Sequence, residues 1–244
     1  MRVICAGKTT AGRIRTSNED NLFLDGIWIE DGKQAGQRPA EGERLWHTYG
    51  VCDGMGGESY GEIASLLAVK TLADFDRPDL AQHFRDYIAQ ANRLICEETQ
   101  RRLVNRMGAA VAVLSIAEDR AAICNLGDCR IYRFGSEGLR QLSRDHREQS
   151  PGLGKGTLTQ HLGIPEDDFL LEPYILTDIP LEEETVFLLC SDGLTDMIPD
   201  GMLEALLREH GRETPASVAG RLLHAAAEQG GRDNITAMVV QITA

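Results

Sequence analysis

The sequence predicts an α+β protein: a layered α/β/β/α sandwich in which a central antiparallel β-sandwich is flanked by helical pairs. Short runs rich in apolar and β-branched residues recur along the 244-residue chain, which is typical of strands. Two pairs of longer segments carry apolar residues at helical spacing. Neither a repeat nor a linker divides the sequence, so we expect a single domain over residues 1–244 in which helices cover a sandwich of strands.

The first half of the chain is expected to combine strands with one helical pair. Residues 31–43 are rich in Gly, Lys, Gln, Pro and Glu, which predicts a surface loop between strands. Asp79 has the position of an N-cap for the second helix. The elements expected here are strands at 2–9, 21–29 and 45–52, followed by helices at 61–75 and 79–103.

The second half is expected to hold short strands followed by the other helical pair. The segment Gly135-Ser136-Glu137-Gly138 between two apolar runs predicts a hairpin. Residues 145–157 are polar and glycine-rich, which is typical of a loop. The elements expected here are strands at 109–116, 121–126, 130–134, 139–142, 171–177 and 185–190, helices at 201–210 and 215–229, and a closing strand at 235–242.

Charge and composition exclude several classes of partner and compartment. The formal net charge of -13 argues against a nucleic-acid or anionic-membrane surface, so anionic substrates must be attracted by bound metal or by a few arginines. No segment has the roughly 20 apolar residues of a membrane span, and residues 1–5 lack the apolar core of a signal peptide. The six cysteines form no CxxC pair and indicate buried free thiols in a reducing compartment. We therefore expect a cytoplasmic protein.

Four short acidic segments are the strongest functional signal. Asp53-Gly54 and Asp192-Gly193 each follow a strongly apolar run, so a buried strand would deliver a carboxylate at its end. Asn18-Glu19-Asp20 and Asp233-Asn234 add further acids near the two ends of the chain. Carboxylates brought together in this way repel one another unless a hard cation lies between them, and oxygen ligands suit Mg2+ or Mn2+. The first hypothesis is a divalent-metal site.

Other catalytic motifs do not fit the sequence. The glycine-rich run that ends in Lys155-Gly156 lacks the Ser or Thr that follows the lysine of a P-loop. The loop after Asp53 lacks the alternating acids of an EF-hand, and no G-x-S-x-G elbow occurs. The six histidines show no HExxH or paired spacing, so zinc is not expected.

In chain order, the acidic segments lie inside longer blocks of sequence that span residues 12 to 240. The blocks are Arg15-Thr16-Ser17-Asn18-Glu19-Asp20, Val51-Cys52-Asp53-Gly54-Met55-Gly56-Gly57, Asn125-Leu126-Gly127-Asp128-Cys129-Arg130, Leu142-Ser143-Arg144-Asp145-His146, Leu158-Thr159-Gln160-His161-Leu162-Gly163, Cys190-Ser191-Asp192-Gly193-Leu194 and Gly231-Arg232-Asp233-Asn234-Ile235-Thr236. Together they resemble the metal-dependent protein phosphatases of the PP2C (PPM) family. The Asp-Gly-Met-Gly-Gly form resembles the bacterial branch.

The resemblance implies a centre of two divalent cations, Mn2+ or Mg2+. Asp53 would bridge both ions. Glu19 and the carbonyl of Gly54 would complete one site, and Asp192 with Asp233 the other. Two such ions activate a bridging water and clamp phosphate oxygens, so a hydroxide would attack phosphorus in line without a protein nucleophile.

Three further roles come with the resemblance. Asp20 would hold a metal-bound water, and Arg15 would bind the substrate phosphate through its planar guanidinium. Asp128 and Asp192 would share a third, weaker ion. Asn234 would orient the loop of Asp233 rather than bind metal.

The function implied is hydrolysis of phospho-Ser and phospho-Thr in proteins. The expected partners are phosphoproteins and their cognate kinase, with no nucleic acid and no membrane, and a monomeric state is expected. By analogy, a chain of this kind resembles phosphatases that oppose a Hanks-type kinase, including in bacterial secretion control. The alternative is a catalytically weak phosphatase-like module for sensing or binding, which loss of acidic ligands would favour; none of the acidic positions is lost.

The main departure from the family is a shortened flap at about 147–157. Relatives in the family have a longer helical segment there, next to the substrate groove. The short glycine-rich version predicts a low, mobile groove wall and modest discrimination among phosphopeptides, with Lys155 as the nearby cation. The alternative is a plain surface connection without substrate contact.

Overall fold

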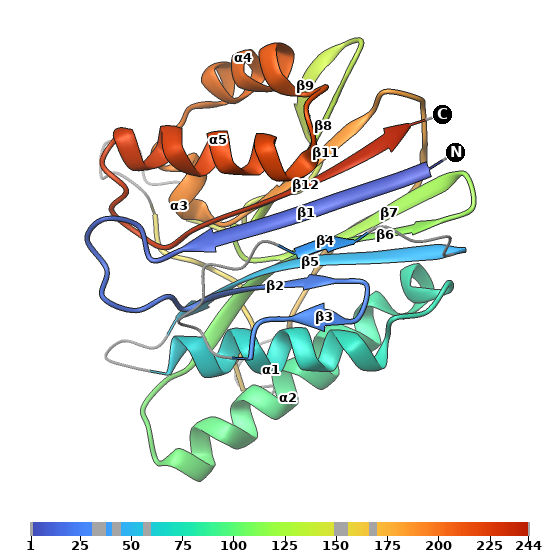
Figure 1. Cartoon of the computed structure of the whole chain (residues 1–244). Helices are drawn as coiled ribbons and strands as arrows, with labels where there is room; N and C mark the ends of the chain where they lie inside the picture. The colour runs from blue at the N-terminus through green and yellow to red at the C-terminus, as the bar shows by residue number, and fades with distance from the viewer. Residues whose placement is uncertain are drawn as a thin grey trace.

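Two six-stranded β-sheets pack face to face, with helices on both outer faces (Figure 1). The computed structural model describes residues 2–30, 45–55, 60–148, 156–165 and 170–243, together with the backbone of 38–40. The first sheet has the strand order β4-β1-β12-β11-β8-β9, and the second has the order β10-β7-β6-β5-β2-β3. The strand pairings in these ranges are antiparallel. The predicted layered α/β/β/α sandwich is confirmed.

The strands occur in chain order as short apolar runs separated by turns or helices. They are β1 (Arg2–Thr10), β2 (Asp20–Leu24), β3 (Ile27–Trp28), β4 (Arg38–Ala40), β5 (Trp46–Met55), β6 (Gly108–Ala117), β7 (Arg120–Leu126), β8 (Arg130–Gly135), β9 (Gly138–Gln141), β10 (Tyr174–Pro180), β11 (Val186–Cys190) and β12 (Ile235–Thr243).

The helices form two layers, one on each sheet. Helices α1 (Gly61–Asp74) and α2 (Phe84–Arg102) cover the second sheet. Helices α4 (Asp200–His210) and α5 (Pro215–Glu228) cover the first sheet, and the short α3 (Asp192–Thr195) follows the end of its central strand β11 (Figure 1). None of the helices in the described ranges is long and apolar enough to cross a membrane.

The core between the sheets follows from the alternation of side chains along the strands. In β11, Phe187 and Leu189 point inward, and in β12, Met238 and Val240 do the same from the neighbouring strand. The opposite faces of these strands pack against the helices. The six cysteines, all within the described residues, form no disulfide. Five of them are buried, as the sequence predicted, and Cys96 is only partly buried.

Residues 21–29 form a hairpin rather than one strand. Strands β2 and β3 are joined by a turn in which Asp25 and Gly26 have φ angles of 46° and 88°. The Asp25 carboxylate accepts a 2.7 Å hydrogen bond from the Thr48 backbone N–H. Asp is one of the residues that tolerate this conformation, so the turn residues interrupt the predicted strand.

Three other boundaries differ from the prediction. The predicted loop 31–43 contains the short strand β4, which pairs with β1. The predicted helix 79–103 begins with a 3-10 turn, η1 (Leu80–His83), and Asp79 makes no side-chain cap bond. Strand β10 begins at Tyr174, which pairs with Asn125 of β7 and directly follows Pro173, a residue that has no backbone N–H to donate.

Candidate metal centre

One end of the sandwich interior is polar, because the inward-facing apolar positions give way to acids and hydroxyls there. Asp20 precedes the inward-facing Leu22 on β2, and Asp53 follows the inward-facing Val51 on β5. The two aspartates are directly paired in the register of β2 and β5. Residues opposite each other in an antiparallel pair share a face, so both carboxylates belong to the space between the sheets.

Asp20 connects the two sheets through one of its carboxylate oxygens. Its Oδ2 accepts hydrogen bonds from Ser191 Oγ at 2.7 Å and Thr236 Oγ1 at 2.6 Å. Its Oδ1 is buried and has no hydrogen-bond partner among the described residues. Burial raises the pKa of Asp20 to about 7, against the two hydroxyl bonds that lower it. A buried oxygen without a partner is costly, so a ligand or water is expected there.

Asp53 lies in a strongly unfavourable electrostatic position. Burial raises its pKa well above the ordinary value, and neighbouring carboxylates raise it further. Those neighbours, in decreasing order of effect, are Asp20, Asp192, Asp128 and Asp233. A cation among these acids would remove the repulsion.

Gly54 allows three chain segments to meet beside Asp53. Its backbone N–H donates to the Glu19 carbonyl at 3.2 Å. A Cβ on Gly54 would lie 2.0 Å from the carbonyl oxygen of Gly61, so no larger residue fits. The Glu19 carboxyl lies next to the start of α1, where burial and the nearby Glu62 raise its pKa.

Asn234 fixes the loop before β2. Its side-chain N–H donates to the Ser17 carbonyl at 2.8 Å, and its Oδ1 accepts from the Glu19 backbone N–H at 2.8 Å. The adjacent Asp233 accepts a 2.8 Å hydrogen bond from Arg15 Nη2. This arrangement brings residues from the two ends of the chain together.

These groups surround a cavity of about 410 Å³. Seven of the eight site residues predicted from the sequence line it, and the eighth, Asp20, lies beside Asp53 on the neighbouring strand. The lining residues are Arg15, Thr16, Ser17, Glu19, Asp53, Gly54, Met55, Ala110, Asp128, Arg147, Leu158, Asp192 and Asp233.

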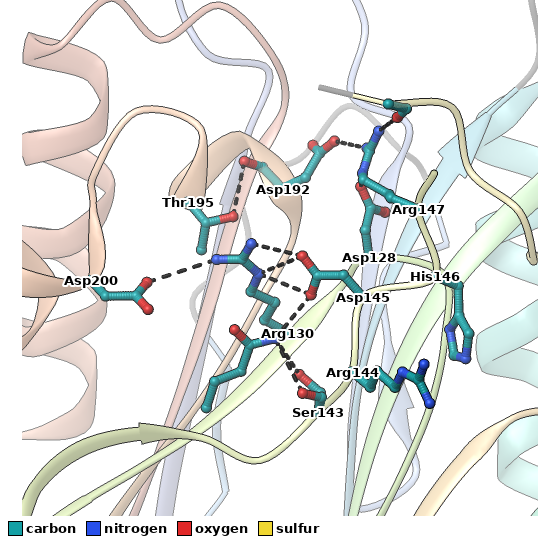
Figure 2. Close-up of polar contacts among 12 residues, drawn as sticks. Asp128, Arg130, Ser143, Arg144, Asp145, His146, Arg147, Asp192, Thr195 and Asp200 are labelled. Atoms are coloured by element: carbon teal, nitrogen blue, oxygen red, sulfur yellow. Dashed lines mark hydrogen bonds and ion pairs between the residues drawn. The ribbon is translucent and has the colours of Figure 1, made fainter. Parts of the chain in front are cut away.

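Arg147 is a cavity residue that the sequence did not single out. Its guanidinium lies against Asp128 and Asp192 (Figure 2). In the sequence, Arg147 was noted only as the start of the shortened flap. The excess of acidic side chains predicted at the site was the signal that a positively charged side chain would lie nearby. Lys155, like Gly152 and Gly154 before it, lies outside the described residues, whereas Gly156 lies within them.

The hydroxyls of Ser191 and Thr236 also had no predicted role. Ser191 extends the inward-facing series of β11, and Thr236 occupies the same face of β12, where it contacts Thr9 at 2.6 Å. Each of these two hydroxyl residues stands at the next inward-facing position after a series of apolar residues on its strand, and this pattern would have indicated Ser191 and Thr236.

The donor set suits a hard divalent cation. In the part of the chain that the structure describes, no three acidic, His or Cys side chains form a ready-made metal cage, and Arg15 and Arg147 each contact an acid. The carboxylates nevertheless face one cavity, with a buried Asp20 oxygen that lacks a partner and a pKa of Asp53 raised by its acidic neighbours. Oxygen ligands of this kind fit Mg2+ or Mn2+.

Comparisons with known proteins agree with this geometry. The family described as Stage II sporulation protein E (SpoIIE) matches residues 49–243. The serine/threonine phosphatase stp of Listeria monocytogenes is 30% identical over 253 residues, which cover 96% of this chain and 94% of the relative. The serine/threonine protein phosphatase PstP of Mycobacterium tuberculosis is 27% identical, over 97% of this chain and 44% of its own length.

Solved structures show the same fold. PppA, described as a key regulatory component of T6SS in Pseudomonas aeruginosa, has a TM-score of 0.80 at 29% identity and covers 99% of this chain and 98% of its own. The catalytic domain of PstP in complex with two manganese ions has a TM-score of 0.79 at 25% identity, with full coverage of both chains.

Fold, cavity and relatives together define a metal-dependent phosphatase scaffold. The chain belongs to the bacterial PP2C (PPM) family of protein serine/threonine phosphatases.

Proposed function

We propose that this protein hydrolyses phospho-Ser and phospho-Thr residues in proteins, using two divalent cations, Mn2+ or Mg2+, at the acidic end of the sandwich. The observation that carries the proposal is the single cavity that collects Glu19, Asp53, Asp192 and Asp233 together with Arg15. Two ions among these acids would lower the pKa of a water, hold phosphate oxygens and neutralise developing charge.

The residues divide into ligands and a substrate clamp. Asp53 would be a ligand shared by the two ions. Glu19 and the Gly54 carbonyl would complete the site of one ion, and Asp192 with Asp233 would complete the site of the other. Arg15, half-exposed at the cavity, binds the phosphate of the incoming side chain in a bidentate manner.

Asp20 does not line the cavity and has a role separate from that of the metal ligands. Its Oδ1 orients a water, while Ser191 and Thr236 hold the other oxygen in place. Among the described residues that line the cavity there is neither Cys nor His, which is consistent with water attacking phosphorus directly.

The cellular partners are proposed on the relatives. The phosphatase would oppose a bacterial Hanks-type Ser/Thr kinase, and the similarity to PppA supports a role in secretion control. We further propose a cytoplasmic monomer that forms one catalytic domain. Phosphoproteomics of a deletion strain complemented with either wild-type or Asp53→Asn protein tests this partner. Phosphorylation of the kinase and its targets should be higher in the strain that carries the variant than in the strain that carries the wild type.

A peptide panel tests the activity itself. With Mn2+ or Mg2+, the protein should release phosphate from phospho-Ser and phospho-Thr peptides and from a small aryl phosphate. Asp53→Asn, which preserves side-chain shape but removes the charge, should not. No release from any phospho-Ser or phospho-Thr peptide by the folded wild-type protein would contradict the proposal.

A further inference from the structure

Arg147 lies between the two acids that the family resemblance assigns to a third ion. Its Nε donates to Asp128 Oδ2 at 2.6 Å, and its Nη2 contacts both that oxygen and Asp192 Oδ2, the latter at 3.2 Å (Figure 2). Asp128 is 3% exposed, Arg147 18% and Asp192 19%. The guanidinium therefore bridges a deeply buried carboxylate and a carboxylate of the proposed metal centre.

A guanidinium and a metal ion compete for these oxygens. The guanidinium is permanently charged and carries only donors, so it cannot ligate a cation and repels one that approaches. A carboxylate as buried as that of Asp128 is costly for the fold unless it is paired with a positive charge. Arg147 supplies that charge from within the chain.

The local backbone fixes Arg147 in this position. Arg147 and Leu158 form a β-bridge, and the Glu148 N–H donates to the Thr157 carbonyl at 3.0 Å. The Arg147 Nη1 also donates to the Gly156 carbonyl at 2.5 Å. The same side chain thus joins both ends of the shortened segment to the acid pair.

We propose that Arg147 is a positioning residue that takes the place of a third divalent ion in this phosphatase. It neutralises Asp128, orients Asp192 and limits the centre to two ions. This inference rests on the proposed function, because it assumes that the remaining acids hold those two ions.

Ion counting tests the proposal without relying on turnover. Each protein is dialysed to equilibrium against rising Mn2+, and bound Mn2+ per chain is measured by elemental analysis. The wild type should reach two ions, Arg147→Met should reach three, and Arg147→Met combined with Asp128→Asn should return to two. Arg147→Lys, which keeps the positive charge, should remain at two.

A matched control comes from the neighbouring arginine. Arg130 forms a comparable ion pair with Asp145 at 2.7 Å but does not line the cavity (Figure 2). Arg130→Met should therefore leave the count at two.

Asp128→Asn alone decides the matter if Arg147→Met fails to fold. Under the proposal this variant leaves the count at two. A wild-type count of three that falls to two in Asp128→Asn would overturn the proposal, and so would a folded Arg147→Met protein that still binds only two.

The phosphatase function and the role of Arg147 are contradicted by different results. Two bound ions without phosphatase activity would contradict the proposed function while the variant counts still decide the role of Arg147. No bound ion in any variant would contradict both.

Discussion

Asp20 and Asp53 are directly paired on the neighbouring strands β2 and β5, with both carboxylates on the face between the sheets. Like charges in such cross-strand positions destabilise a sheet, and burial adds to the cost. The fold therefore maintains an unfavourable arrangement at one end of an otherwise apolar interior. A divalent cation would convert this repulsion into attraction, which links metal binding to stability.

The first prediction concerns stability and pH in the metal-free protein. The pKa of Asp20 is raised to about 7 in the folded state, so between pH 4 and 7 the folded state holds a proton that the unfolded state has released. Stability should thus fall as pH rises through this window. Thermal unfolding in EDTA should show a melting temperature that decreases by several degrees, and Asp20→Asn should flatten the decrease.

The exposed Asp119, on the turn between β6 and β7, provides the control. Asp119→Asn should retain the wild-type slope. A wild-type and an Asp20→Asn profile that run parallel would show that Asp20 contributes nothing to the pH dependence.

The second prediction concerns metal and stability. Ligands that bind only the folded state stabilise it by about 2.7 kcal/mol at 100 times the Kd. For a chain of this size, that corresponds to a rise in melting temperature of roughly 5–11 °C with Mn2+. Asp53→Asn should show a much smaller rise, although its metal-free form should be more stable than the wild type because one repelling charge is gone. If Mn2+ raised the melting temperature of Asp53→Asn as much as that of the wild type, the ions would bind at a site that does not include Asp53.

The third prediction concerns the proposed metal ligands Asp192 and Asp233. Asp192→Asn and Asp233→Asn should each lower kcat by roughly 10²–10³, the range for loss of one group that stabilises the transition state. Circular dichroism should show an intact fold. Glu209→Gln, an exposed acid on α4, is the control and should retain full activity. Near wild-type turnover by Asp192→Asn would refute the site assignment.

The fourth prediction concerns Arg15. Arg15→Ala should raise KM and lower kcat, because the phosphate loses a bidentate partner. Arg15→Lys should recover charge but not the planar geometry, so its KM should lie between those of the other two. Inhibition by inorganic phosphate should weaken in the same order. Equal phosphate inhibition of all three proteins would assign phosphate binding to another group.

The fifth prediction concerns Asn234 as a positioning residue. Asn234→Ala removes bonds to Ser17 and Glu19, which should lower stability by about 1–3 kcal/mol and weaken Mn2+ binding. Asn92→Ala is the matched control, because this buried side chain similarly bonds Gly163 and Ile164 at a distant loop. It should lower stability without changing Mn2+ affinity. Similar metal affinities in both variants would reduce Asn234 to a structural role.

Part of the candidate site could be predicted from local signals, whereas the roles of Asp20, Asp128 and Arg15 came only with the family resemblance. Asp53 and Asp192 follow apolar strands and precede glycine, and that pattern is visible without tertiary structure. The presence of two helical pairs among many short strands also predicted the layers of the fold. Turn residues such as Asp25-Gly26 shifted boundaries because a local side-chain bond overrode strand propensity.

What the sequence did not predict depends on contacts between distant segments. Ser191 and Thr236 acquire their role only when the two sheets place them against Asp20. Arg147 acquires its role only because Asp128, between β7 and β8, and Asp192, at the start of α3, meet beside it. The role predicted for Lys155 stays a prediction, since that residue lies outside the described ranges.

The acidic end of the sandwich, as proposed above, is a two-ion phosphatase centre. The most direct test measures bound Mn2+ per chain and the rate of phosphate release from a phospho-Thr peptide on the same samples, as Mn2+ is titrated into chelated protein. A two-ion centre should show no turnover without metal and a rate that rises with occupancy of the second ion. Full turnover by chelated, metal-free protein would contradict it.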